Sequence, residues 1–549
     1  MGMKTLRFRG VLCCIMASAL LFTGLVCGGG LSTLAAVESV NGSDSLVRTS
    51  LTEIKNVLTS ISYTDYLAMY ESSGRPDETV DIDIFGNING DETNITYQVV
   101  DGAEYGKDGK VLLIGDDGKI SFNINIKTAG FYNILVEYYT GNISVYDADG
   151  NLATVGKNAS IERMVMIDGK VPFKEARSIS FSRAWADSYP ELDGDYKVVK
   201  TDGNKTYYDS TSTKFFESVA NGDRIFQRDN NGNEMKPEKN IVGIWYTKRL
   251  FDSSGYSNAP LMFHFENGEH VISLNTVREP FAVKSIKLVP IAETISYEEY
   301  LAEHKNAKDY SGDDIIIQAE YPSLASDRTL YQLNDRTSVI SQPQDSALIR
   351  LNSIGGDKWT YVGQWIEYTF EAPEDGFYYV VPRSIQNVTS GKYVSRKIYI
   401  NGEVPFTEAN YTRFDFSDTW KTDALNDGTT EFKFFLNKGI NTIRLEVALG
   451  DLAGLLSTIE TSLNTCNSYY RKILMITGPD PDEYRDYRFE RLMPEVLKGM
   501  LQQVDIINNV SDQLAKITGG KGESAAALEK VTLTLERMGK YPDKIASQL

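Results

Sequence analysis

Cysteine is scarce in this chain of 549 residues. Of the four cysteines, Cys13, Cys14 and Cys27 lie close to the N-terminus, which leaves Cys466 alone in the remainder. A single thiol excludes an intramolecular disulfide there, so hydrophobic cores have to hold the fold. At 42% hydrophobic content, a chain of this length supplies enough apolar side chains for several such cores.

Histidine and positive charge are also in short supply. Only His264, His270 and His304 are present, and no two of them have the helical spacing of a zinc-binding motif. The chain has 56 Lys and Arg against 75 Asp and Glu, a formal net charge of −19, which argues against nucleic acid and anionic lipid as ligands. A neutral ligand fits this composition better.

Long apolar runs are confined to the N-terminus. Three basic residues precede an apolar stretch over residues 11–27, and small residues follow up to Ala36. This pattern predicts an export signal over residues 1–36, because the stretch is shorter than the roughly 20 residues that span a bilayer. We expect cleavage, no transmembrane span afterwards, and a secreted, extracellular protein associated with the cell surface. Lipid attachment at Cys27 is a lesser alternative.

One sequence pattern occurs twice in the chain. The segment 61–68 recurs at 295–302, and Gly-Phe-Tyr at 130–132 recurs at 376–378. The longest match begins at Arg163 in the first copy and at Arg396 in the second, and it includes the turns Asp168-Gly169 and Asn401-Gly402. A duplication of this extent predicts two structurally related modules.

Both copies show the alternation of half-buried β-strands. The alternating apolar residues are Ile120, Phe122, Ile124 and Ile126 in the first copy and Ile366, Tyr368 and Phe370 in the second. Asp-Gly and Asn-Gly pairs supply the positive φ angles of tight hairpins. Short strands between regular turns predict a mainly β fold with two antiparallel β-sandwich modules of the jelly-roll type.

Beyond residue 450 the apolar period becomes helical, as in Val496, Met500, Val504, Ile507 and Leu514. This period predicts a C-terminal α-helical bundle, in which Cys466 is a small buried residue. The expected order is a helical linker over 37–75, a sandwich over 76–292 with a long loop insertion at about 186–241, a short helical linker over 293–312, a sandwich over 313–449 and the helical region over 450–549.

Segments of the second copy resemble galactose-binding-like sandwiches that serve as carbohydrate-binding modules. These segments are 317–320, 362–368, 376–378 and 437–443. The paired Ser-Tyr-x-x-Tyr-Leu segments and the run 476–487 resemble the front part of extracellular solute-binding proteins of clostridial ABC sugar importers. The resemblance implies a non-catalytic protein that binds an oligosaccharide or polysaccharide and works with an ABC-type importer component in the membrane.

That family carries a two-lobed solute-binding region after these modules, and this sequence lacks one. The chain is therefore expected to be either a truncated solute-binding protein or a stand-alone surface protein. Two other functions stay open. A glycoside-active enzyme needs only two carboxylates, which the insertion could supply. A structural or adhesive surface protein would use the sandwiches as spacers.

Exposed aromatic rings stack on sugars, which makes the tryptophans the first candidates for a binding site. Trp185 and Trp420 hold matching positions in the two copies, and the resemblance implies sugar stacking for Trp420 and more weakly for Trp185, with packing as the alternative. Trp359 and Tyr361 lie on a loop before a strand and are expected at the rim of a site. Trp365, inside that strand, is expected in the core.

Gln318 and Glu320 occupy the place where related sandwiches hold a structural calcium ion. Calcium prefers several carboxylate and carbonyl oxygens, and two side chains fall short of that number. An edge strand with solvated polar residues is the alternative. We expect no other cofactor.

Overall fold

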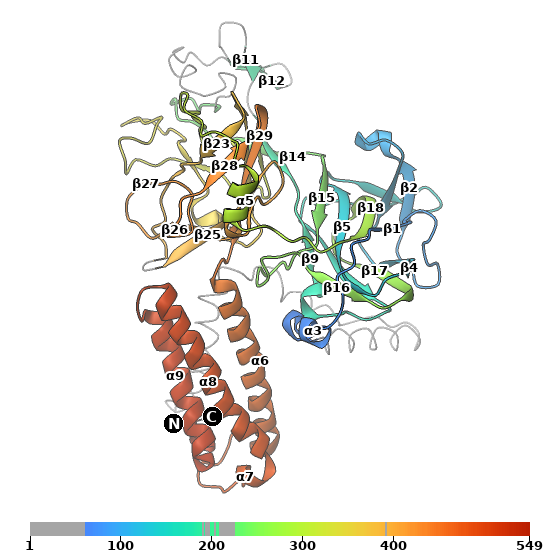
Figure 1. Cartoon of the computed structure of the whole chain (residues 1–549), viewed down its shortest axis with the longest axis vertical. Helices are drawn as coiled ribbons and strands as arrows, with labels where there is room; N and C mark the ends of the chain where they lie inside the picture. The colour runs from blue at the N-terminus through green and yellow to red at the C-terminus, as the bar shows by residue number, and fades with distance from the viewer. Residues whose placement is uncertain are drawn as a thin grey trace.

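The computed structural model describes residues 61–188, 191–192, 198–202, 205–207, 226–389 and 392–548. The predicted export signal over 1–36, Cys27 and part of the insertion lie outside these residues. Two β-sandwiches lie side by side, and a helical bundle extends from the second one (Figure 1). The mainly β fold with two antiparallel sandwiches and a C-terminal helical bundle is confirmed.

The first sandwich consists of two antiparallel sheets around one large core. The larger sheet contains β1 (Val80–Ile82), β2 (Tyr97–Asp101), β3 (Lys110–Ile114), β5 (Gly130–Tyr139), β15 (Trp245–Arg249), β16 (Met262–Phe265) and β18 (Phe281–Val289). The smaller sheet contains β4 (Lys119–Ile126), β17 (Gly268–Arg278), β8 (Ile161–Ile167) and β9 (Ile179–Phe181). A hairpin of β6 (Ser144–Tyr146) and β7 (Leu152–Val155) lies beside them.

The second sandwich has one wide sheet faced by short strand pairs. The wide sheet runs in the order β14 (Glu238–Ile241), β10 (Trp185–Ser188), β19 (Leu324–Ala325), β22 (Trp365–Ala372), β29 (Gly439–Ala448), β25 (Tyr393–Ile400) and β26 (Thr412–Asp415). The pairs are β23 (Gly376–Tyr379) with β28 (Lys433–Leu436), β24 (Arg383–Ser384) with β27 (Lys421–Thr422), and β20 (Gln332–Leu333) with β21 (Ser353–Ile354).

The wide sheet of the second sandwich includes two strands from the insertion of the first module. Within β10, Trp185 pairs antiparallel with Ala325 of β19, and β14 pairs along the other edge of β10. Further along the insertion, β11 (Glu191–Leu192), β12 (Val198–Asp202) and β13 (Lys205–Tyr207) form a small sheet. The insertion therefore joins the two modules through backbone hydrogen bonds, and we call this junction the seam.

The duplication holds at the level of single hydrogen bonds. Helix α3 (Tyr63–Met69) leads into the first sandwich, and α5 (Tyr297–Glu303) leads into the second. The phenol of Tyr63 accepts the Met262 N–H at 2.9 Å, and that of Tyr297 accepts the Lys433 N–H at 2.9 Å. Since both tyrosines pack against their cores, the two helices are integral parts of the sandwiches and not free linkers.

The helical region begins directly after β29. It contains α6 (Leu452–Thr477), α7 (Phe489–Leu492), α8 (Pro494–Ile517), α9 (Glu523–Lys540) and α10 (Ile545–Gln548). The predicted apolar stripe of α8 is buried against α6 and α9, which confirms the helical period. Within the described part of the chain, no helix combines the length and the apolar character that a membrane span needs.

The seam gives a first prediction. Trp185 is 6% exposed, so Trp185→Ala leaves a cavity where β10 joins the wide sheet. Truncation of a buried tryptophan costs about 3 kcal/mol or more. We expect a clear fall in the urea midpoint followed by circular dichroism, and Tyr361→Ala, a change at a 45% exposed ring, serves as the control. Equal, small effects of both variants would contradict a structural role for Trp185.

Candidate functional site

Trp185 does not lie at the rim of a sandwich. Its indole is buried, and its backbone is paired on both sides, with Ile241 of β14 and Ala325 of β19. A ring in this position cannot stack on a sugar, so the weaker of the two stacking assignments is wrong and the packing alternative describes Trp185. The physical reason is the insertion, which turns the strand that follows the duplicated segment into a bridge between modules.

Trp359 and Tyr361 lie where the second sandwich faces the first. The Trp359 ring is half-buried under the Arg396 guanidinium, 4.3 Å from the ring centroid, and its indole N–H donates to the Gln364 carbonyl at 3.3 Å. Tyr361 is exposed, and the neighbouring Val362 contacts the loop at Gly255 of the first module. Trp359 therefore has a packing role on at least one face, and the rim role expected of the exposed Tyr361 stays a prediction.

Trp420 is half-buried on the loop before β27. Its indole N–H points at two acceptors of a neighbouring loop, the Asp335 carboxylate at 3.1 Å and the Thr337 hydroxyl at 3.2 Å. The predicted sugar-stacking role of Trp420 stays a prediction. The contacts show that the indole also ties its own loop to the 335–337 loop.

A polar pocket takes part of its lining from the chain segment that contains Trp420, although Trp420 itself is not among the lining residues. Its lining comes from β24, β26, β27 and the loops around them, and comprises Pro382, Ser384, Gln386, Arg413, Phe414, Asp415, Ser417, Lys421, Asp423, Ala424, Leu425 and Asn426. Two of these residues, Ser417 and Lys421, flank Trp420 along the chain. Reasoning from aromatic residues misses this pocket, although the polar run from Ser417 to Asn426 was a signal in the sequence.

The charged groups of the pocket differ in how they are held. Arg413 is fixed from two sides, since its Nε donates to Asp415 at 2.7 Å and its guanidinium lies 4.0 Å from the centre of the Tyr393 ring. Lys421 and Asp423 are exposed. Residues two apart on an extended chain point to the same side, so an ammonium and a carboxylate face the pocket together.

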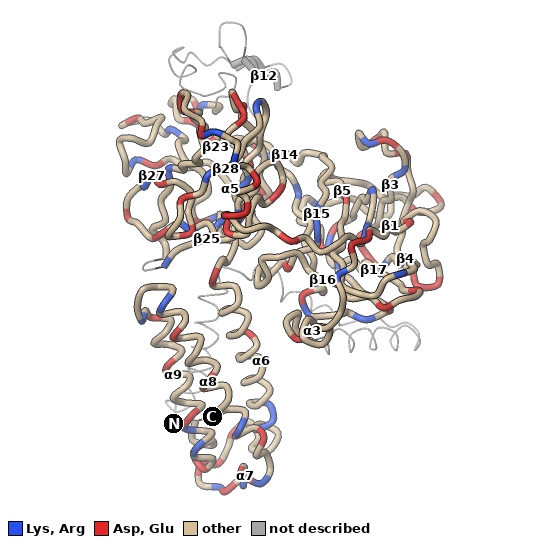
Figure 2. Tube along the Cα trace, viewed as in Figure 1, with Lys and Arg blue, Asp and Glu red and all other residues tan. Residues whose placement is uncertain are grey.

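The pocket is balanced in charge. Arg413 and Lys421 contribute two cations, and Asp415 and Asp423 contribute two anions. Figure 2 shows basic and acidic residues interspersed over both sandwiches in the same way. Such a pocket offers donors and acceptors without a net field, which suits a neutral polar ligand better than an ionic one.

Gln318 and Glu320 do not assemble a calcium site. Within the described residues, no group of three or more His, Cys, Asp or Glu side chains could hold a metal ion. Glu320 is 2% exposed, and its backbone carbonyl accepts the Gln332 amide at 2.9 Å. Two other carboxylates of this region are already ion-paired, Asp187 with Lys239 and Glu234 with Arg228. Because the ligand set for Ca²⁺ is incomplete, the residues present do not fit that ion.

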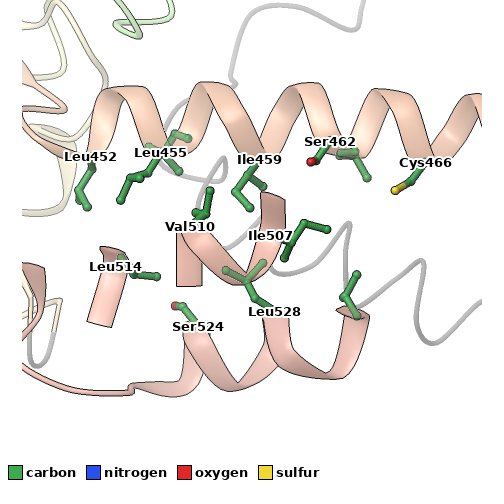
Figure 3. A pocket seen from close by; sticks show the side chains of 13 residues that line it. Leu452, Leu455, Ile459, Ser462, Cys466, Ile507, Val510, Leu514, Ser524 and Leu528 are labelled. Atoms are coloured by element: carbon green, nitrogen blue, oxygen red, sulfur yellow. The ribbon is translucent and has the colours of Figure 1, made fainter. Parts of the chain in front are cut away.

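A second pocket lies between the helices of the bundle. Figure 3 shows side chains of α6 facing those of α8 and α9, among them Leu455, Ile459 and Leu528. Serine and cysteine are the only polar residue types in its lining, so the pocket offers a sugar few hydrogen-bond donors and acceptors. Burial raises the pKa of Cys466 to about 11, which favours the protonated and less reactive thiol at neutral pH.

The helical region has a recognisable relative. Residues 455–549 match the family model described as the bacterial solute-binding protein, 4-helix bundle domain. The bundle is similar to that domain. The match leaves both sandwiches uncovered, and a comparison with curated proteins finds no match.

Solved structures of carbohydrate-active proteins overlap with parts of the chain. A family 35 carbohydrate-binding module from Clostridium thermocellum has 13% identity, 38% coverage of this chain, 97% coverage of its own and a TM-score of 0.16. A GH26-CBM35 β-(1,4)-mannanase from Podospora anserina has 10% identity, and the overlap covers 40% of this chain and 29% of the mannanase with a TM-score of 0.17. The cycloalternan-forming enzyme from Listeria monocytogenes has 12% identity, and the overlap covers 64% of this chain and 20% of the enzyme with a TM-score of 0.17.

The overlap spans less than a third of either enzyme. TM-scores this low give none of these three likenesses any weight in assigning a function. The fold assignment rests instead on the strands and hydrogen bonds of the chain itself, and the site assignment on the lining of the polar pocket.

Glu320 gives a pH prediction. Burial raises the pKa of Glu320 from 4.5 to about 8. A carboxyl whose pKa is higher in the folded state contributes stability that is fully present below pH 4.5 and is lost as the pH rises through 8. Over that interval, we expect the melting temperature of the wild type to fall relative to that of Glu320→Gln.

The control for this experiment is Glu371→Gln, a change at an exposed position of the same sandwich. Added Ca²⁺ should leave the melting temperature of the wild type unchanged at pH 8, where about half of the Glu320 carboxyl is ionised. A calcium-dependent rise that Glu320→Gln abolishes would contradict the incomplete ligand set.

Proposed function

We propose that this protein is a non-catalytic, extracellular carbohydrate-binding protein that holds a neutral sugar in the polar pocket of the second sandwich. The observation that carries the proposal is the lining of that pocket, which contains two cations, two carboxylates, two side-chain amides and two hydroxyls. We further propose that the protein serves an ABC-type importer at the cell surface.

The chemistry of a sugar explains why such a lining is suitable. Each hydroxyl of a pyranose both donates and accepts a hydrogen bond, so a binding site needs acceptors and donors in alternation. Asp423 accepts, Lys421 donates, and Asn426 does both. One face of the sugar ring is apolar and packs against an aromatic ring, which is the role proposed for Trp420 at the edge of the pocket.

The match of the helical region supports the link to import. The matched domain occurs by its description in bacterial solute-binding proteins, whose task is to capture a solute. In this chain three residues separate the bundle from the last strand of the second sandwich. The sandwich that would bind the sugar and the bundle that would contact the importer are therefore directly joined. The importer partner itself remains part of the proposal.

The carboxyl groups argue for binding without hydrolysis. A glycosidase needs a general acid, a carboxyl group with a raised pKa, next to the scissile bond. Among the described residues, the carboxyls with a raised pKa are those of Glu175, Glu234, Asp252 and Glu320, and none of them lines the pocket. Release of reducing ends from a glycan panel would support the enzyme alternative.

The first test removes the two exposed charges of the pocket. Lys421→Ala and Asp423→Ala each delete a charge-assisted hydrogen bond to sugar hydroxyls, which is worth about 1.5 kcal/mol or more. We expect each change to weaken binding roughly tenfold or more in calorimetric titration with a sugar found on a glycan array. Asp418→Ala, on the same loop but outside the pocket, should bind like the wild type.

The second test separates the two roles of Trp420. Trp420→Phe keeps an aromatic face but removes the indole N–H that binds Asp335 and Thr337. Trp420→Ala removes both. If the ring stacks on the sugar, the Phe variant retains most of the affinity and the Ala variant loses it, with melting temperatures of the two variants close together. Equal binding by both variants and the wild type would refute stacking.

A further inference from the structure

The duplication allows the polar pocket to be located in the first sandwich. In the first sandwich the Leu250 N–H donates to the Ile134 carbonyl at 3.0 Å, and in the second the Leu425 N–H donates to the Val380 carbonyl at 2.9 Å. Leu250 therefore corresponds to Leu425. Counting along the paired strands, the cross-strand pair Tyr138–Tyr246 of β5 and β15 corresponds to Ser384–Lys421 of β24 and β27.

The opposite wall of the pocket can be aligned in the same way. Arg163 of β8 pairs with Ile179 of β9, and its counterpart Arg396 of β25 pairs with Thr412 of β26. Continuing along the strands, Ser180, Phe181 and Ser182 of the first sandwich correspond to Arg413, Phe414 and Asp415 of the pocket. Both walls thus have a counterpart in the first module.

In the first sandwich, larger side chains fill the corresponding space. Tyr138 stands in place of Ser384 and is 2% exposed. Its ring lies 5.1 Å from that of Phe181, and its hydroxyl donates to the Ser182 carbonyl at 3.0 Å. Phe281 of β18 closes the remaining side, with its ring 4.7 Å from Phe181. The second sandwich turns into α6 after β29 and, among its described residues, has no strand in the place of β18.

The filled space is also covered, because the second sandwich rests on it. The Arg444 guanidinium lies 4.8 Å from the ring of Tyr246 and is hydrogen-bonded to its hydroxyl. The ring of Trp365 lies 6.1 Å from that of Tyr246. Lys248, which stands in place of Asp423, donates to the Ser180 carbonyl at 3.3 Å. The residues that would open a pocket to solvent therefore anchor the neighbouring module.

We propose that the chain has one sugar site, in the second sandwich, and that the corresponding site of the first sandwich has become the anchoring surface for the second. This inference rests on the proposed function and deepens it. It means that the duplicated modules bind monovalently and supply no avidity. The first sandwich instead holds the second sandwich, which carries the pocket, in a fixed orientation.

The test is a titration of the full exported chain with short neutral oligosaccharides, using cello-, manno- and malto-tetraose as probes. We expect a fitted stoichiometry of one for whichever probe binds, and the double variant Lys421→Ala/Asp423→Ala should weaken all binding at least tenfold. Hydrogen exchange with and without the bound probe should show new protection around 382–386 and 413–426, and no change around 138, 180–182 and 246–248.

A matched variant tests the anchoring role. Tyr246→Phe removes only the hydroxyl that contacts Arg444, so the melting temperature should fall while the affinity and the stoichiometry stay at the wild-type values. A stoichiometry of two, or loss of affinity in Tyr246→Phe, overturns the inference and leaves the proposed function intact. Residual tight binding in the double variant contradicts the pocket assignment and overturns both proposals. Absence of binding to any neutral sugar overturns the proposed function and, with it, this inference.

Discussion

The pairing of Trp185 with Ala325 determines how the whole molecule is arranged. This pairing adds backbone hydrogen bonds to the side-chain contacts between the two sandwiches, such as the donation from Lys397 Nζ to the Asn258 carbonyl at 3.0 Å. Through the pairing, a strand of the first module becomes part of the wide sheet of the second. Next to the seam, the Arg444 guanidinium of the second sandwich lies 4.8 Å from the ring of Tyr246 in the first and is hydrogen-bonded to its hydroxyl. Because the Arg444 side chain is only 12% exposed, this contact helps to hold the two modules in one orientation, and the pocket has a fixed place relative to both.

The two copies preserve their scaffold and differ in their side chains. Tyr132 and Tyr378 both donate to the carbonyl four residues before them, at 2.7 Å in each copy, so the hydrogen-bond framework is the same. At the pocket, however, Ser384 replaces the bulk of Tyr138. A change of side-chain volume at a few positions of an unchanged framework thus separates a filled, covered surface from an open, polar one.

Much of the fold could be predicted from the sequence, because strand alternation, the helical period of α8 and the duplication are local or repetitive signals. Trp365 was expected in the core and lies there. The seam could not be predicted, since β19 has two residues and its partner lies far away in the chain. The strand pairing also aligns Phe181 with Phe414 and not with Phe416, so Trp185 and Trp420, expected at matching positions, are not structural counterparts. The pocket was missed because its lining is polar and spread over several strands.

The direct junction between β29 and α6 has a mechanical consequence. Leu449, Gly450 and Asp451 separate the end of β29 from the start of α6, and the Tyr393 hydroxyl holds the Asp451 carboxylate at 3.0 Å. The helix has 26 residues, about 39 Å at 1.5 Å per residue. Because the helix is continuous, any partner that bound the far end of the bundle would also set the distance and the tilt of the second sandwich relative to that partner.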